Sequence, residues 1–278
     1  MTAALFAYAT ISDGFGTTVR VHSFTTLDQR TGEAACWARL SYYSGLAPGR
    51  GLTMPADVVL YPIHPAWNAT RIDANLGGQR EIEWDGGAAK LTRGWLRSRT
   101  PMQYLTIRSR QTPHRLALAA GGGKLRATNG LEAAIELVFV ADREGELWVG
   151  EKLAAGAVAF LNRIERPDAI RRFRELVLEN EPEPPAALSG DDSHFAVMQQ
   201  RQWRQTYGGR FGFQSGEARL ATSLMNEAVA ELAGLAGRPA LALPPRSYVA
   251  VTATGPEVEL GMRGAEEEAS FHVIVGQW

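Results

Sequence analysis

The sequence predicts a mainly β protein, with an antiparallel, immunoglobulin-like β-sandwich first, then two helices and a short antiparallel meander. Short apolar or alternating runs recur about every ten residues between positions 3 and 163, which is the pattern of an all-β sandwich. The chain also holds 29 Gly and 14 Pro, many of them between those runs. Helical periodicity becomes evident only after Arg166. A β-barrel is the second choice for the first part.

Residues 1–165 form the predicted β-sandwich domain. Turn pairs such as Asp13-Gly14 and Asn129-Gly130 separate its strands, and Glu144-Gly145 predicts a tight hairpin. The segment 33–43 fits either a strand or a short helix. The strands expected in this part are Leu5–Ile11, Thr18–Phe24, Val58–Ile63, Glu81–Trp84, Leu91–Leu96, Tyr104–Arg108, Arg115–Leu118, Ile135–Ala141 and Glu146–Val149.

Residues 166–278 form the predicted α+β domain. Pro167 suits a first helical turn, and Ile170, Phe173 and Val177 fall on one helical face, so a helix is expected from there to about residue 180. The acidic, Pro-rich stretch 181–192 reads as a linker. The remaining elements expected are a helix over 217–236 and three strands, Ser247–Thr252, Glu257–Met262 and Ala269–Val275.

Composition excludes several classes of site. The chain has 278 residues and a formal net charge of −1, which is unlike the usual basic nucleic-acid-binding domain. Its single cysteine, Cys36, excludes a disulfide framework or a Cys-rich zinc site, and reads as a buried, inert thiol. The five histidines show no metal-binding spacing, and no phosphate-binding glycine motif is present. We therefore expect no metal and no cofactor.

The segment from Gly86 to Leu131 is strongly basic and contains no Asp or Glu. In extended strands its arginines would alternate with aromatic residues on one side, an arrangement that binds phosphate-rich partners. The opposing interpretation is that these are solvated strand faces, neutralised by carboxylates elsewhere in the fold. The candidate binding residues are Arg93, Trp95, Arg97, Arg99, Tyr104, Arg108 and Arg110.

The hypothesis that the protein is an enzyme rests on Asp191, Asp192, His194 and His272. A carboxylate and an imidazole could serve a hydrolase whose site lies between the two parts of the chain. The same Asp-Asp-Ser-His stretch is also ordinary turn or capping chemistry, and His272 reads more simply as a hydrogen-bonded structural histidine. An enzyme is therefore the less favoured interpretation.

Four segments carry a resemblance to a known group of proteins. They are Leu27–Gly32, Leu40–Pro48, Gly94–Pro101 and Asn129–Leu131. They resemble uncharacterised bacterial membrane-anchored proteins with a soluble, β-rich extracytoplasmic part, over about the first 165 residues. The resemblance carries over no catalytic residue. It implies an extracytoplasmic location, whereas the absence of a signal-peptide pattern leaves a cytoplasmic location as the alternative.

Together these observations predict a non-enzymatic binding or scaffold module of the bacterial cell envelope. Its partner would be another envelope protein or an anionic surface. A hydrolase is the first alternative, and a cytoplasmic nucleic-acid-binding protein is the second. The sequence leaves the oligomeric state and the ligand open.

Overall fold

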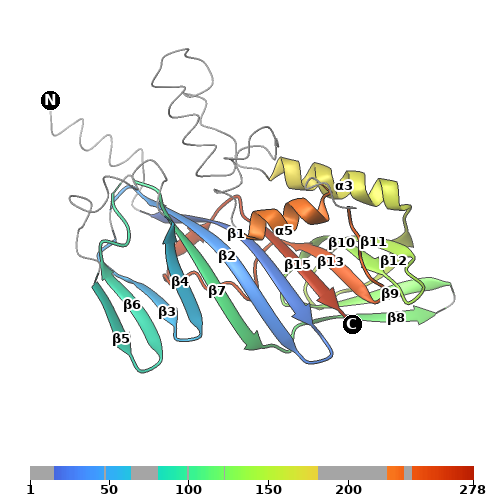
Figure 1. The fold of residues 1–278 in the computed structure, drawn as a ribbon, viewed down its shortest axis with the longest axis horizontal. Coiled ribbons are helices and arrows are strands. Elements are labelled where there is room, and N and C mark those ends of the chain that lie inside the picture. The colour runs from blue at the N-terminus through green and yellow to red at the C-terminus, as the bar shows by residue number, and fades with distance from the viewer. Residues whose placement is uncertain are drawn as a thin grey trace, which may run out of the picture.

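The computed structural model describes residues 16–46, 48–63, 81–98, 100–121, 123–180, 224–234 and 240–278. It is mainly β, as the sequence predicts, with one large mixed sheet and one small sheet (Figure 1). The strands are β1 (Thr17–Asp28), β2 (Glu33–Ser44), β3 (Leu52–Pro55), β4 (Val58–Ile63), β5 (Glu81–Asp85), β6 (Ala88–Arg93), β7 (Met102–Gln111), β8 (Arg115–Gly121), β9 (Lys124–Gly130), β10 (Ile135–Ala141), β11 (Leu147–Leu153), β12 (Val158–Arg163), β13 (Ser247–Thr252), β14 (Ala265–Glu267) and β15 (Phe271–Gln277).

The large sheet joins strands from both ends of the chain. Its order is β4-β7-β2-β1-β15-β13-β10-β11-β12-β9-β8, with β14 paired to β1 off this path. β1 pairs in parallel with β15 and β14, whereas the other neighbours along the path are antiparallel. The late strands β13 and β15 thus lie between β1 and β10, so residues from both predicted parts build one sheet.

Several elements differ in detail from the sequence prediction. The segment 33–43 is the strand β2, paired on both sides with β1 and β7. The predicted second meander strand, 257–262, is not a strand; residues 265–267 form β14 instead. The hairpin at Glu144-Gly145 is present between β10 and β11, with Gly145 at a φ of 82°. The predicted strand Leu5–Ile11 and the linker 181–192 lie outside the described residues.

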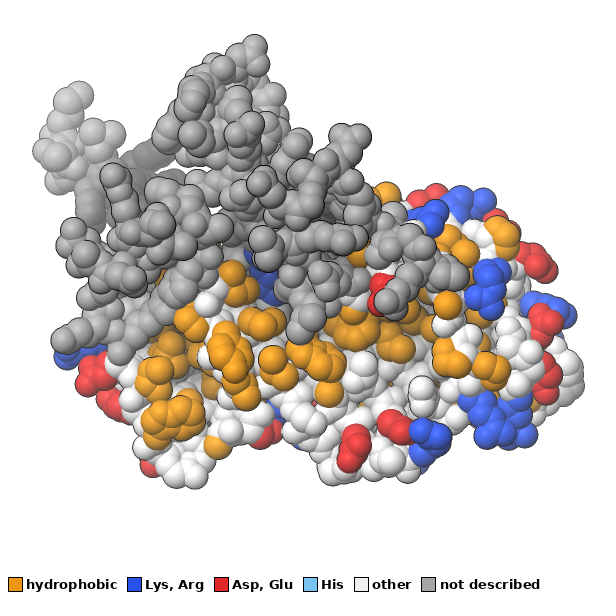
Figure 2. All heavy atoms as spheres, viewed as in Figure 1, with side chains coloured by type: hydrophobic (Ala, Val, Ile, Leu, Met, Phe, Trp, Pro, Cys, Tyr) orange, Lys and Arg blue, Asp and Glu red, His pale blue; other side chains and the backbone are white. Residues whose placement is uncertain are grey.

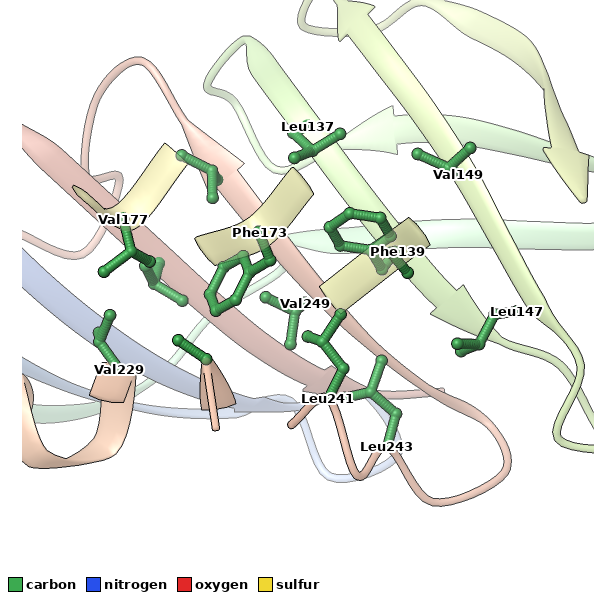
Figure 3. Packing of buried hydrophobic residues seen from close by; sticks show 14 of the residues in the cluster. Leu137, Phe139, Leu147, Val149, Phe173, Val177, Val229, Leu241, Leu243 and Val249 are labelled. Carbon is green, nitrogen blue, oxygen red and sulfur yellow. The ribbon is translucent and has the colours of Figure 1, made fainter. Parts of the chain in front are cut away.

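Within the described ranges, two helices cover one face of the large sheet. The predicted first helix is α3 (Arg166–Glu179), and α5 (Leu224–Leu232) falls within the second predicted helix. Phe173 of α3 is fully buried and meets Phe139 of β10 edge-to-face, with ring centroids 6.4 Å apart (Figure 3). Ala169 and Val177 bury the same helix face, which is the face that the apolar spacing predicts.

The opposite face of the sheet holds two further cores. Near one end, β8, β9 and β12 fold back over β10 and β13 and enclose residues such as Leu116, Leu125 and Tyr248. Near the other end, the small sheet, ordered β3-β6-β5, packs on β1, β2 and β7 through residues such as Leu52 and Leu91. Among the described residues, no helix is long and apolar enough to cross a membrane.

Candidate binding surface

The two arginines predicted on β7 each face a carboxylate. Nε of Arg108 donates to Oδ2 of Asp57 at 2.8 Å, and Arg110 donates to Glu257. The hydrogen bond from Arg108 lowers the pKa of Asp57. The hydrogen bond from Arg110 to Glu257 raises the pKa of Arg110. The sequence placed Arg108 and Arg110 on one side of a strand, and they do share it, but their charges are neutralised there.

Glu257 is the centre of a buried polar cluster. Its Oε1 lies 2.8 Å from Nδ1 of His114, whose Nε2 lies 3.1 Å from Oε2 of Glu132. Burial would raise the pKa of Glu257, but the hydrogen bonds from Arg110, Thr112 and His114 and the charge of Arg110 outweigh burial and lower it. The cluster ties the loop after β13 to the sheet, which is a structural role.

The two aromatic residues of the predicted site are buried. Trp95 is 2% exposed and Tyr104 is 0% exposed. The indole N–H of Trp95 donates to the carbonyl of Arg50, and the Tyr104 hydroxyl donates to the carbonyl of Trp95. Both rings pack edge-on against Tyr42. They hold the small sheet on the large one and present no ring to a partner on the surface.

Two of the other three predicted arginines, Arg93 and Arg97, lie at the end of β6 and just after it. Arg93 is exposed and its Nε is 3.4 Å from Oε2 of Glu81. Arg97 is exposed in the turn that bridges to Thr100. Arg99 lies outside the described residues. The segment turns after Arg93, because the strand ends there and Gly94 adopts a φ of 68°. Side-chain alternation therefore does not extend from Arg93 to Arg97.

A different part of the basic segment keeps its charge unpaired. We define the β8–β9–β12 face as the outward side chains of Arg115, Lys124, Arg126, Val158 and Phe160. All five are exposed, with Phe160 at 64% and Val158 at 58%. Within the described part of the chain, none of the three cations has a carboxylate within ion-pair distance.

The register of the strands brings these residues together. Arg126 pairs across the ladder with Phe160 on one side and with Ala119 on the other, so the three share one face. Nζ of Lys124 lies 5.7 Å from the centroid of the Phe160 ring. Sequence reasoning included the three cations in the basic segment but missed strand β12. The continuous apolar run 157–161, bounded by Gly156 and Asn162, was the available signal.

A hydroxyl, an imidazole and a carboxylate form a relay inside the sheet. Oγ of Ser23 lies 2.8 Å from Nδ1 of His272, and Nε2 of His272 lies 2.7 Å from Oε1 of Glu267. Ser23 is 2% exposed and His272 is 0% exposed. A Cβ added at Gly255 would lie 2.7 Å from Nδ1 of His272, so the loop rests directly on the ring. The other catalytic candidates, Asp191, Asp192 and His194, lie outside the described residues.

Two further features limit the chemistry of the described residues. No group of three or more His, Cys, Asp or Glu side chains within them is placed to hold a metal ion. Cys36 is buried, and burial raises the pKa of its thiol to about 11, so the thiolate is scarce at neutral pH.

Apolar side chains also reach the surface on the helix-bearing face. Val59 and Tyr61 of β4 are 48% and 54% exposed. They point to the side of the sheet that carries Leu105 and Ile107 of β7. Figure 2 shows hydrophobic side chains gathered over this end of the sheet. Among the described residues, no charged pattern accompanies them that would identify a partner.

Comparisons with known proteins give no family. No family model matches the chain, and no curated protein matches it. Solved structures match weakly. Two forms of an M1 zinc metallopeptidase from Deinococcus radiodurans, one of them a mutant, are 10% and 12% identical, with TM-scores of 0.22 and 0.21. The matches cover 53% and 41% of this chain and 39% and 26% of those chains.

Aminopeptidase A from Legionella pneumophila, in complex with aspartic acid, is 12% identical with a TM-score of 0.23. That match covers 53% of this chain and 19% of the aminopeptidase. Each of these three matches therefore covers less than half of the solved structure.

Proposed function

We propose that this protein is a non-enzymatic binding module that docks onto an anionic lipid surface through the β8–β9–β12 face. One observation carries the proposal: Arg115, Lys124 and Arg126 have no carboxylate partner among the described residues and lie beside the exposed side chains of Val158 and Phe160. Unpaired cations around exposed apolar groups suit the boundary between lipid headgroups and acyl chains.

The magnitudes fit reversible docking. Each Lys or Arg near an anionic membrane contributes about 1 kcal/mol, so the three cations contribute about 3 kcal/mol. Burying the Phe160 ring adds about 1.5–3 kcal/mol. Binding of this strength is weak and depends on salt, because added salt screens exposed charges. The paired arginines of β7 add little, since Asp57 and Glu257 already neutralise them.

Vesicle co-sedimentation tests the proposal. We expect the protein to pellet with vesicles that contain phosphatidylglycerol, to remain soluble with pure phosphatidylcholine, and to be released as salt is raised. The double variant Lys124→Glu/Arg126→Glu should bind at least tenfold more weakly, because each reversal replaces an attraction of about 1 kcal/mol by a repulsion. The control Arg143→Glu/Arg263→Glu makes the same charge change at exposed sites elsewhere.

Equal loss of binding in the two double variants would contradict a specific face. Binding to single-stranded DNA without binding to vesicles would instead support the nucleic-acid reading. The nucleic-acid reading is less favoured because Phe160 is the one exposed ring on this face, and stacking of successive bases uses several.

The lipid surface that we propose is that of the bacterial cell envelope, outside the cytoplasm. This location is supported by the resemblance to the extracytoplasmic parts of membrane-anchored proteins. A cytoplasmic location is the alternative. The finer description as an immunoglobulin-like sandwich belongs to the same proposal, since two packed β layers would form a stiff platform for docking.

A hydrolase is the second candidate, and the Ser23–His272–Glu267 relay favours it. Both distances are within hydrogen-bond reach, as nucleophilic catalysis requires. Burial of Ser23 opposes it, because a substrate would have to reach that hydroxyl. Hydrolysis of a nitrophenyl ester that disappears in the Ser23→Ala variant, with the fold retained, would support this candidate over the binding module.

A further inference from the structure

The outer edge of the small sheet forms a second exposed surface. β5 is the edge strand of the order β3-β6-β5, and it lies at one end of the described elements (Figure 1). In the described part of the chain it pairs with β6 alone. An edge strand points the backbone N–H and C=O groups of every second residue outward, where they can pair with another chain.

The two sides of β5 differ in chemistry. Ile82 and Trp84 are 52% and 74% exposed. They lie opposite Leu91 and Ala89 of β6, which are both buried, and Leu91 belongs to the core that the small sheet shares with the large one. Ile82 and Trp84 therefore continue the core-facing side of the small sheet beyond the area that the large sheet covers. Alternation places Glu83 and Asp85 on the other side of the strand.

We infer that the β5 edge binds an extended peptide segment that adds a strand to the small sheet. The segment has apolar side chains on one face, to pack on Ile82 and Trp84, and Lys or Arg on the other, to meet Glu83 and Asp85. Main-chain pairing supplies affinity and the alternating side chains supply selectivity in this mode of recognition. The inference concerns a different surface from the β8–β9–β12 face and does not depend on it.

Charge argues against a second copy of this chain as the occupant. Pairing of two β5 edges would set the carboxylates of Glu83 and Asp85 against the same residues of the other copy. Like charges directly opposite each other in a sheet are destabilising. A basic strand makes the opposite, favourable cross-strand pairs. Glu83 already lies opposite Lys90 within the hairpin, and its other flank faces the open edge.

A peptide of alternating Lys and Val tests the inference. We expect isothermal titration to show binding, and hydrogen exchange of the complex to show protection of the amides of residues 81–85. The same peptide with every second backbone nitrogen methylated should bind at least tenfold more weakly. Methylation removes main-chain donors and leaves the side chains unchanged.

Protein variants test the charge part separately. The Glu83→Lys/Asp85→Lys variant should bind the Lys-Val peptide at least tenfold more weakly and should bind a Glu-Val peptide more tightly. Glu144→Lys/Glu179→Lys, a matched change at exposed sites, should leave binding unchanged. Equal binding of the methylated peptide, or protection away from β5, would overturn the inference.

Discussion

At the scale of single residues, the partners of the β7 arginines decide what those arginines do. Glu257, 4% exposed, sits against Arg110, whereas Asp57, 41% exposed, sits against Arg108. A buried carboxylate that loses its cation cannot rehydrate, but a surface carboxylate can. The two arginines look equivalent in the sequence, but the loss of each ion pair has a different cost in stability.

The Arg110→Met variant should therefore lower the free energy of unfolding by about 2 kcal/mol, below the usual 3–5 kcal/mol for a buried pair because Arg110 is about a third exposed. Arg108→Met should cost under about 1 kcal/mol, since Asp57 stays hydrated. Urea unfolding of both variants measures the difference. Equal losses of stability in the two variants would mean that the burial of Glu257 does not determine the cost of removing its arginine partner. Neither change should alter vesicle binding.

At the scale of elements, α3 shows how a local pattern becomes a packed contact. The apolar face that the spacing predicts meets the sheet through Phe173, which also contacts the Phe139 ring. Most of the stability of such a helix comes from the face it buries, because a short helix is marginal alone in water. Removing the Phe173 ring, and with it the contact to Phe139, therefore tests directly what holds α3 on the sheet.

We predict that Phe173→Ala lowers the free energy of unfolding by about 3–5 kcal/mol, because it removes a buried ring and leaves a cavity against β10. Leu178→Ala is the control on the same helix, since Leu178 is 49% exposed and should cost no more than about 0.5 kcal/mol. Thermal and urea denaturation measure both. A loss under 1 kcal/mol for Phe173→Ala would show that α3 is not held by this contact.

At the scale of the whole molecule, buried ionisable groups link stability to pH. Burial, and then the charges of Arg20, Arg39 and His272, lower the pKa of His22 from 6.5 to about 3. Nε2 of His22 is buried without a hydrogen-bond partner. Between pH 6.5 and 3 the unfolded chain binds a proton on His22 that the folded protein does not, so stability falls as the pH falls through this range.

Two carboxylates act in the same direction at lower pH. Burial would raise the pKa of Glu267, but its hydrogen bond with His272 and the charge of that ring lower it, as the contacts of Glu257 lower the pKa of Glu257. Their stabilising contribution is present above the ordinary value of 4.5 and is lost as the pH falls below it. His22 therefore contributes to the loss from pH 7 to 5, and the carboxylates add to it below.

We expect His22 to account for about 2 kcal/mol of lost stability between pH 7 and pH 5, at about 1.4 kcal/mol per pH unit below its ordinary pKa. His22→Leu should remove that part of the slope, because no proton then binds at this position in either state. Urea unfolding at the two pH values, compared between the protein and the variant, measures it. An unchanged slope in His22→Leu would contradict the assignment.

Local patterns in the sequence determined the strands Val58–Ile63 and Ile135–Ala141, the Glu144-Gly145 hairpin and α3. Side-chain period and turn residues act within a few positions, and those signals need no distant partner. They also located the basic segment, whose lack of acidic residues marked it as the candidate source of cations for binding.

The tertiary structure alone decided which of the basic residues keep a free charge. Asp57 and Glu257 neutralise β7 from 51 and 147 residues away along the chain, and no local pattern registers partners at that distance. Pairing across the sheet likewise made 33–43 a strand and set β13 and β15 between β1 and β10. Long-range backbone pairing and burial select such arrangements, so they appear only when the chain is folded.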